Sequence, residues 1–287
     1  MTAVFKKELR TYFTTLTGYA FLGFLVLITG YFFVSQNIAN YSADYSETLV
    51  GTMIMFLILV PVLTMRLFAE EARQKTDQLL YTSPLHITDI VLGKFFAACF
   101  LFFVGLAITM VFPYILSLYA EINVKGTLGV VAGYFLMGCC LISVGIFVSV
   151  LTDNQIVAAA GTFAALFLLL MVDNIANSAP ISRISSLIFL AVIVLIVLSV
   201  FWSGTKSVGG VILVGLVLYA LLVGAFFLFP SLFDSTIVRV LGWFSVLNRF
   251  QNFYIGVFVI SDVIYYITFS GAFLYLTASV IEKRRWS

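Results

Sequence analysis

The chain has 287 residues, of which 62% are hydrophobic and only 10% are charged. Soluble domains have about 45–50% apolar and about 25% charged residues, so this composition excludes a soluble enzyme. The net charge of +2 gives no support for nucleic-acid binding. We therefore predict an all-α polytopic membrane protein whose helices use the lipid bilayer as their solvent.

Residues 1–16 are predicted to form an amphipathic helix that lies in the membrane interface. One helical face carries Phe5, Leu9, Tyr12, Phe13 and Leu16. The remaining, solvent-facing positions are Lys6, Lys7, Glu8, Arg10 and Thr11. This pattern is typical of a helix that turns its lysines toward anionic headgroups, and a frayed tail is the alternative. No apolar stretch precedes a cleavage site, so we do not expect a cleaved signal peptide.

Eight apolar stretches are long enough for transmembrane helices, which need about 20 residues each. They lie near residues 18–37, 48–66, 88–118, 127–151, 155–173, 184–203, 208–229 and 254–281. Only a short polar segment separates the two stretches within 184–229. If that pair forms a re-entrant hairpin, six full spans remain. Pro61 and Pro113 lie inside the second and third stretches and are predicted to kink them.

The lysines and arginines predict the orientation, because cytoplasmic loops carry an excess of both. Eight spans place eleven of them on one side: Lys6, Lys7, Arg10, Arg66, Arg73, Lys75, Lys94, Lys206, Lys283, Arg284 and Arg285. The other side receives Lys125, Arg183, Arg239 and Arg249. We therefore expect both ends of the chain in the cytoplasm, as an even number of spans requires.

A charged segment at residues 67–87 connects the second and third stretches on the predicted cytoplasmic side. In and beside it lie Arg66, Glu70, Glu71, Arg73, Lys75, Asp77, His86 and Asp89. It also carries Leu79, Leu80 and Tyr81, which a solvated linker does not need. Helix propensity is high up to Thr82, after which Ser83 and Pro84 end the helix. A short helix with an exposed apolar tip indicates a docking element, and a solvated hairpin is the alternative.

Residues 230–254 on the outer side are too short and too charged for a full span. Asp234, Ser235 and Thr236 form a plausible N-cap for a following apolar segment. Two short re-entrant helices that close the outer mouth of a transport route fit this pattern, and an interfacial loop with aromatic anchors is the alternative. Asp262 lies near the outer start of the last span. We expect it to pair with Arg239 or Arg249 or to be solvated, rather than to relay protons.

The sequence contains no visible catalytic or metal-binding constellation. The three cysteines, Cys99, Cys139 and Cys140, lie in apolar stretches, and His86 is the only histidine. The segment Ser203–Ser207 lacks the upstream glycines of a nucleotide-binding loop. We therefore expect no metal, no cofactor and no ATP hydrolysis in this chain. Active transport would need a partner or an ion gradient.

Four stretches of the chain resemble the membrane-spanning subunit of type-2 ABC transporters, closest to the gliding-motility-type permeases. They are Phe5–Phe13 with Gly18 and Tyr19, Pro61–Pro84 with Ile90–Lys94, Ser149–Ala158, and Phe250–Trp286. The second stretch is the most specific, because a charged loop matches by chance less easily than an apolar helix. Lys75 stands where these loops often have glycine, and Gln78 where they often have glutamate.

The resemblance implies that residues 1–287 form a single ABC-2-type transmembrane domain with a coupling helix that docks on a separate ATPase subunit. That contact would involve Phe68, Glu70, Glu71, Arg73, Thr76, Leu79, Leu80, Ser83 and Pro84. ATP and Mg would bind to the ATPase. A second permease subunit, identical or different, would face this one, with an extracytoplasmic accessory subunit as a further possible partner. The outer gate candidates are Asp234, Arg239, Trp243, Arg249 and Asp262.

The resemblance thus implies a permease for ATP-driven export in the cytoplasmic membrane of a prokaryote. Two other classes remain open. A gradient-driven transporter or channel usually carries several ionisable groups at mid-membrane, whereas the polar residues here are mostly Ser, Thr, Asn and Gly. A membrane scaffold that transports nothing is the third class. Typical relatives have six spans, so the apolar pair within 184–229 is a departure from the family pattern.

Overall fold

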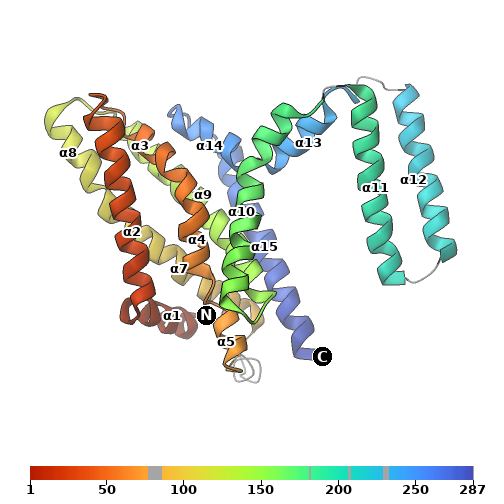
Figure 1. Ribbon diagram of the computed structural model, residues 1–287, viewed down its shortest axis with the longest axis horizontal. Helices are drawn as coiled ribbons and strands as arrows, with labels where there is room; N and C mark the ends of the chain where they lie inside the picture. Colours follow the sequence, from red (N-terminus) through yellow and green to blue (C-terminus); the bar gives the residue numbers. More distant parts are fainter. Residues whose placement is uncertain (77–85, 181, 206–207, 229–232, 287) are drawn as a thin grey trace. The chain divides into compact units, whose positions relative to one another are not determined.

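The computed structural model describes residues 1–76, 86–180, 182–205, 208–228 and 233–286, and its regular elements are helices (Figure 1). The first half contains α1 Thr2–Thr14, α2 Leu16–Phe32, a π-helix Phe33–Ile38, α3 Tyr45–Thr52, a 3₁₀ turn Met53–Met55, α4 Phe56–Thr64, α5 Ala69–Arg73, α7 Ile87–Thr109, α8 Val111–Tyr119 and α9 Val124–Val150. The second half contains α10 Gln155–Ser178, α11 Arg183–Thr205, α12 Val208–Leu228, α13 Thr236–Phe244, α14 Val246–Tyr254 and α15 Ile260–Trp286.

Six helical stretches of the described residues are long and apolar enough to cross a membrane. They are Leu16–Ile38, Tyr45–Arg73, Ile87–Tyr119, Val124–Val150, Gln155–Ser178 and Ile260–Arg285. Two shorter apolar stretches, Arg183–Ile196 and Leu213–Leu228, lie within α11 and α12. The all-helical membrane fold predicted from the sequence is thus confirmed. The choice between six and eight spans stays a prediction.

The chain forms two compact units. The first comprises Met1–Leu168 and Val246–Ser287, and the second comprises Leu169–Ser245. The long helix α10 begins in the first unit and ends in the second. The two short helices predicted within 230–254 are present as α13 and α14, and they belong to different units. Their insertion into the outer leaflet stays a prediction.

Helix α9 is central to the first unit, where it packs against α4, α7, α14 and α15. Glycines on α9 allow its neighbours a close approach. A Cβ atom at Gly138 would collide with the ring of Phe102 on α7, and one at Gly145 would collide with Thr64 on α4. Small residues at helix contacts are the usual way in which membrane helices pack tightly. This packing holds α4 and α7, the two helices on either side of the charged segment in the sequence, against α9.

The helix of the third predicted span is interrupted next to a proline. Helix α7 ends at Thr109 and α8 begins at Val111, two residues before Pro113. Proline has no N–H group for the carbonyl four residues earlier, here that of Thr109. The hydroxyl of Tyr45 donates to that carbonyl at 3.5 Å. At Pro61, in contrast, the helix α4 continues through the proline without an interruption.

One end of the first unit gathers both ends of the chain and α5, with which the charged segment begins (Figure 1). Helix α1 lies at this end beside α5, and Arg284 of α15 contacts Asp153 there. The opposite end gathers Asp44, Glu121, Asn123 and Gly256 around a cavity of 290 Å³. The two ends of the chain therefore lie on the same side of the first unit. The compartment that this side faces is not defined by the fold and stays a prediction.

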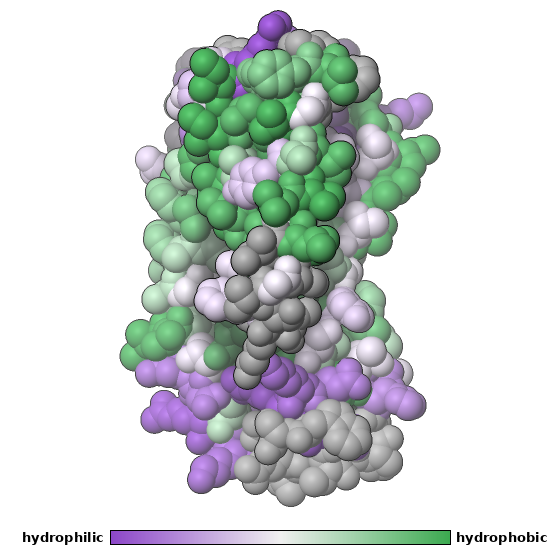
Figure 2. All heavy atoms as spheres, turned by 90° about the vertical axis from the view of Figure 1, so that its right-hand side faces the viewer, coloured by the Kyte–Doolittle hydropathy of each residue, from purple (hydrophilic) through white to green (hydrophobic). Residues whose placement is uncertain are grey.

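The second unit contains an apolar helical hairpin. Helices α11 and α12 pack against each other, and the hydroxyl of Tyr219 donates to the Ala191 carbonyl at 2.9 Å. At the base of the hairpin, Arg183 pairs with Asp234 at 2.6 Å. Apolar side chains cover the face of this hairpin that is turned to the viewer in Figure 2. Such a surface suits lipid or another membrane helix better than water.

Candidate functional site

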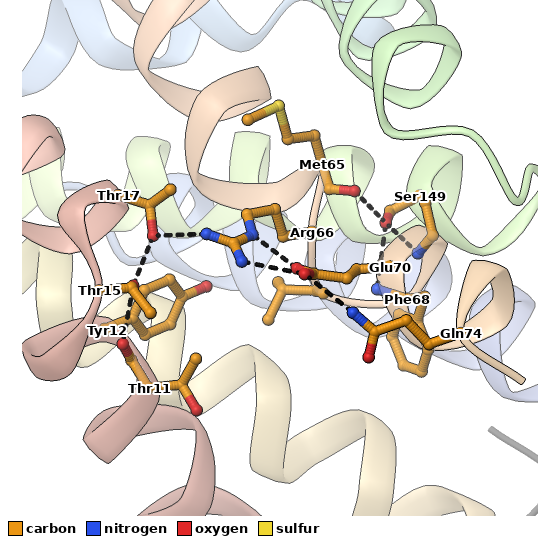
Figure 3. A network of polar contacts seen from close by, with 12 residues as sticks. Thr11, Tyr12, Thr15, Thr17, Met65, Arg66, Phe68, Glu70, Gln74 and Ser149 are labelled. Atoms are coloured by element: carbon orange, nitrogen blue, oxygen red, sulfur yellow. Dashed lines mark hydrogen bonds and ion pairs between the residues drawn. The ribbon is translucent and has the colours of Figure 1, made fainter. Parts of the chain in front are cut away.

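The charged segment begins at α5, and α9 fixes its first turn. The hydroxyl of Ser149 on α9 accepts hydrogen bonds from the backbone N–H groups of Phe68 and Ala69, at 3.2 and 3.3 Å (Figure 3). The same hydroxyl donates to the Met65 carbonyl at 3.4 Å. The first N–H groups of a helix have no partner within the helix. A buried side chain from a membrane-spanning helix therefore caps the start of α5.

A bidentate ion pair stiffens the passage from α4 to α5. The guanidinium of Arg66 donates to both carboxylate oxygens of Glu70, at 2.6 and 3.0 Å. A third nitrogen of Arg66 contacts the Thr17 hydroxyl at 3.4 Å, which connects the pair to the start of α2 (Figure 3). Gln74 donates to Glu70 at 3.3 Å. Arginine is well suited to such planar recognition of a carboxylate.

A buried lysine joins α1, α5 and α7. Lys94 of α7 is only 1% exposed. Its ammonium lies 3.0 Å from Glu8 of α1 and 2.9 Å from Glu71 of α5. It also donates to the Leu67 carbonyl at 2.5 Å and lies 4.9 Å from the centre of the Phe68 ring. A charge buried in a membrane-spanning helix needs such partners, because desolvation is otherwise too costly.

Lys7 completes a ring of two cations and two carboxylates. Its ammonium lies 2.7 Å from Glu71 and 3.7 Å from Glu8. Partial burial lowers the pKa of Lys7, but the hydrogen bond and the charge of Glu71 outweigh it, and the pKa is raised above 10.5. We call Lys7, Glu8, Glu71 and Lys94 the charge ring. Its charges balance, so α1 and α5 are joined without a net buried charge.

A cavity of 660 Å³ lies beside the charge ring, between α1 and the passage from α4 to α5. Its floor includes Tyr12, whose hydroxyl donates to the Leu63 carbonyl at 3.2 Å. Complete burial raises the pKa of Tyr12 well above its ordinary value, so this hydroxyl stays a donor at neutral pH. The cavity rim carries Arg66, Glu70 and Gln74. The α1–α5 contact therefore combines the charge ring with apolar and aromatic side chains of α1 and α4.

The structure divides the predicted partner-binding residues into groups. Phe68 is buried, and Glu70 and Glu71 turn toward the bundle in the ion pairs described above. Arg73 is exposed at the end of α5, and the Thr76 hydroxyl donates to the Glu71 carbonyl at 3.3 Å. The other four, Leu79, Leu80, Ser83 and Pro84, lie outside the described residues. The predicted docking tip is thus untested.

Two details of the sequence prediction are wrong. The helix that was expected to run on to Thr82 is interrupted, because α5 ends at Arg73 and Lys75 adopts a left-handed conformation with φ 57°. That conformation is costly for a residue with a Cβ atom, and glycine adopts it readily. The predicted helical residues 77–82 lie outside the described residues. Glu8 was assigned to the solvated face of α1, but it is 7% exposed because it pairs with Lys94.

Three residues of the site, Lys94, Glu8 and Ser149, were not among those predicted from the sequence. A signal was present for Lys94, because it is an isolated lysine at the inner end of an apolar stretch. Its partner could be found only from the fold, since Glu8 lies 86 residues earlier in the chain. Ser149 carried no local signal, as a serine in an apolar helix usually bonds to its own helix.

The predicted outer residues also separate into two groups. In the first unit, the carboxylate of Asp262 is fully buried and accepts hydrogen bonds from Arg249 at 3.1 Å and from Asn252 at 2.7 Å. The predicted pairing of Asp262 with Arg249 is thus confirmed. Arg249 also lies over the ring of Tyr265, at 5.3 Å from its centre. These contacts join α14 to α15.

In the second unit, Arg183 draws the Asp234 side chain away from the predicted N-cap position. The hydrogen bond and charge of Arg183 lower the pKa of Asp234. Ser235 instead precedes α13 in a left-handed conformation, without a side-chain cap. Arg239 donates to the Asp234 carbonyl at 2.9 Å, and Trp243 is exposed.

The arrangement holds one short helix against the helices around it. No group of three or more His, Cys, Asp or Glu side chains that could hold a metal occurs among the described residues. The ion pairs and hydrogen bonds instead connect one short helix, α5, to α1, α2, α7 and α9. A displacement of α5 must therefore move or break contacts with all four.

Comparison with known proteins agrees with this architecture. A family model described as ABC-2 family transporter protein matches residues 3–188, which is more than half of the chain. The matched segment includes the charge ring, Ser149 and α5. It ends within α11, so α12 to α15 lie beyond it. No curated protein matches the chain.

Proposed function

The chain belongs to the ABC-2 transporter family, and on that premise we propose that it is the permease subunit of an ATP-driven exporter. ATP and Mg bind to a separate ATPase subunit. A second permease subunit, identical or different, completes the membrane part, and an extracytoplasmic subunit is a further partner. The charged stretch 61–84 favours the gliding-motility type and a prokaryotic cytoplasmic membrane.

The observation that carries the proposal is the attachment of α5 to the bundle. Ser149 caps its first turn, and the charge ring ties Glu71 to α1 and α7. A partner that pushes on the segment beyond Thr76 therefore acts on three parts of the bundle at once. This is what a subunit without its own energy source needs. ATP-driven closure of the partner would displace α5 and rearrange the helices around it.

Accessibility labelling tests the proposed orientation. A single cysteine replaces exposed Arg73 or exposed Lys125, in a background in which Cys99, Cys139 and Cys140 are serine or alanine. A membrane-impermeant maleimide added to intact cells should label position 125 and leave position 73 unlabelled until the membrane is opened. Labelling of position 73 from outside would reject both the orientation and docking on a cytoplasmic ATPase.

The partner contact is tested at the tip of the segment. We predict that Leu79→Asp or Leu80→Asp abolishes stimulation of the ATPase by the permease, because a charge cannot enter an apolar groove without a large desolvation penalty. Membrane insertion should be unchanged. Leu79→Met, which conserves volume and polarity, is the matched control. Co-purification measures whether the permease still binds the ATPase, and ATPase assays in nanodiscs measure the stimulation. Full stimulation in the aspartate variants would exclude this docking role.

Transport in vesicles separates this proposal from the other two classes. A permease of an ATP-driven exporter moves its substrate only with the ATPase and ATP, whereas a gradient-driven transporter moves it without them. A scaffold moves nothing in either case. As outer gate candidates we retain Arg249 and Asp262 of the first unit and Asp234, Arg239 and Trp243 of the second.

A further inference from the structure

A second, almost entirely apolar groove lies between α1 and α7. Its walls are five phenylalanines, namely Phe5 of α1, Phe96, Phe100 and Phe103 of α7, and Phe135 of α9. The volume is 510 Å³, more than three times that of a cavity of about 150 Å³ that binds benzene. The space is therefore suited to a ligand with a long apolar part.

The groove opens on the surface of a membrane-spanning helix. Phe96, Phe100 and Phe103 follow one another at helical spacing and are each 42–53% exposed. Edge-to-face contacts hold the rings, with centroids 6.1 Å apart for Phe5 and Phe100 and 5.8 Å apart for Phe103 and Phe135. The molecules that surround such a surface are bilayer lipids, and rigid ring faces fit a linear hydrocarbon chain.

Positive charge lies next to the groove on α1. Lys6 directly follows Phe5 and lies one helical turn after Thr2, which also lines the groove. Arg10 lies one turn further along α1. Both side chains are exposed, and in the described part of the chain neither has an ion pair, whereas neighbouring Lys7 is paired with Glu71. Two unpaired cations beside an apolar groove match a lipid that carries a negative headgroup.

We propose that this groove binds one acyl chain of an anionic phospholipid, whose phosphate pairs with Lys6 and Arg10. The bound chain packs Phe5 against Phe100 and so holds α1 against α7. The same two helices carry Glu8 and Lys94 of the charge ring. The lipid thus stabilises the helix contact from its membrane side. This site does not depend on the proposed export function, so each can fail without the other.

Tryptophan quenching by brominated lipids tests the proposal. The native residues Trp202, Trp243 and Trp286 are replaced by phenylalanine, and a single tryptophan is introduced as Phe100→Trp in the groove. Phe24→Trp on α2, where the side chain is 57% exposed, is the control outside the groove. Phe103→Trp serves as a second groove reporter. The protein is placed in vesicles of phosphatidylcholine and phosphatidylglycerol, with one or the other brominated on its acyl chains.

The ratio of the binding constants for the two lipids at one position is independent of the depth of the tryptophan. Each basic residue near the membrane surface favours anionic lipid by about fivefold, so we expect phosphatidylglycerol to be preferred at least about fivefold at position 100. The Phe24→Trp control should show a ratio near one. Lys6→Gln with Arg10→Gln should abolish the preference at position 100 and leave the control unchanged.

Two results would overturn the proposal. Equal binding constants at both groove reporters would mean that only unselective bilayer lipid fills the groove. A preference for phosphatidylglycerol that survives the double substitution would mean that Lys6 and Arg10 do not hold the headgroup.

Discussion

Replacement of Lys94 by methionine removes the charge that joins α1, α5 and α7 while nearly conserving side-chain volume. The ammonium lies within 3.0 Å of both Glu8 and Glu71 and is almost completely buried. In the variant, two carboxylates remain in an environment from which water is largely excluded. Lys7 still contacts both, at 2.7 and 3.7 Å, and so compensates for part of the lost charge.

Removal of one partner from a buried ion pair typically costs about 3–5 kcal/mol, because the other charge stays buried without compensation. The lost hydrogen bond to the Leu67 carbonyl adds about 1.5–3 kcal/mol, as expected for a charged donor. Lys7 reduces the first cost, so we expect a total near 3–5 kcal/mol. Combining Lys94→Met with Glu8→Gln and Glu71→Gln should recover most of this loss, since neutral groups of similar shape tolerate burial better than unpaired charges.

Equilibrium unfolding in mixed detergent micelles measures these differences. Lys125→Met is the matched control, because Lys125 is exposed in the first turn of α9 and makes no ion pair in the described part of the chain. We expect the control to stay within about 0.5 kcal/mol of the native chain. If Lys94→Met is no less stable than the control, or if the triple variant is less stable than Lys94→Met, the charge ring does not hold these helices together.

Three further predictions concern the same region. Ser149→Ala leaves two buried N–H groups at the start of α5 without an acceptor and should cost about 1–3 kcal/mol in the same unfolding assay; an unchanged stability would contradict the cap. Lys75→Gly relieves a left-handed conformation and should raise stability by about 0.5–1 kcal/mol, so a loss of stability would show that the turn is unstrained. Glu71 raises the pKa of Lys7 above 10.5 in the folded chain, despite the opposing effect of partial burial. The contribution of Lys7 to the stability of the fold is therefore complete below pH 10.5 and is lost as the pH rises through the raised pKa of the folded chain. The difference in stability between the native chain and Lys7→Gln should accordingly be constant from neutral pH to pH 10.5 and shrink above it. A difference that grows above pH 10.5 would contradict an upward shift of the Lys7 pKa.

The long helices could be predicted from the sequence because their signal is local. About 20 consecutive apolar residues must form a helix in lipid, since no water is present to satisfy the backbone. The amphipathic pattern of residues 1–16 likewise predicts a helix, which the structure confirms as Thr2–Thr14. The same pattern gave the wrong environment for Glu8. A charged residue is assigned to water by default, and only the fold reveals that Lys94 approaches it from the other side.

The early end of α5 shows a second limit of local reasoning. Gln74 and Lys75 follow residues of high helix propensity, but they form a turn. Propensity differences amount to about 0.7 kcal/mol per residue or less among ordinary residues, so tertiary contacts easily override them. Tertiary contacts also decide where α5 starts, through Ser149 and the Arg66–Glu70 pair. Neither contact can be inferred from the neighbouring sequence, because Ser149 lies 81 residues from the N–H group of Phe68 that it caps.

A joint built from several ion pairs tolerates movement better than a packed apolar contact does. In the charge ring, each of the two lysines contacts each of the two carboxylates. One pair can therefore lengthen while the remaining three keep every charge compensated, whereas a packed apolar contact loses burial as soon as it opens. Stability alone does not require such a ring, because apolar replacements of buried ion pairs are often neutral or stabilising. If the variant with Lys94→Met, Glu8→Gln and Glu71→Gln folds well but no longer supports ATP-driven transport, the ring is needed for movement of the helices rather than for their stability.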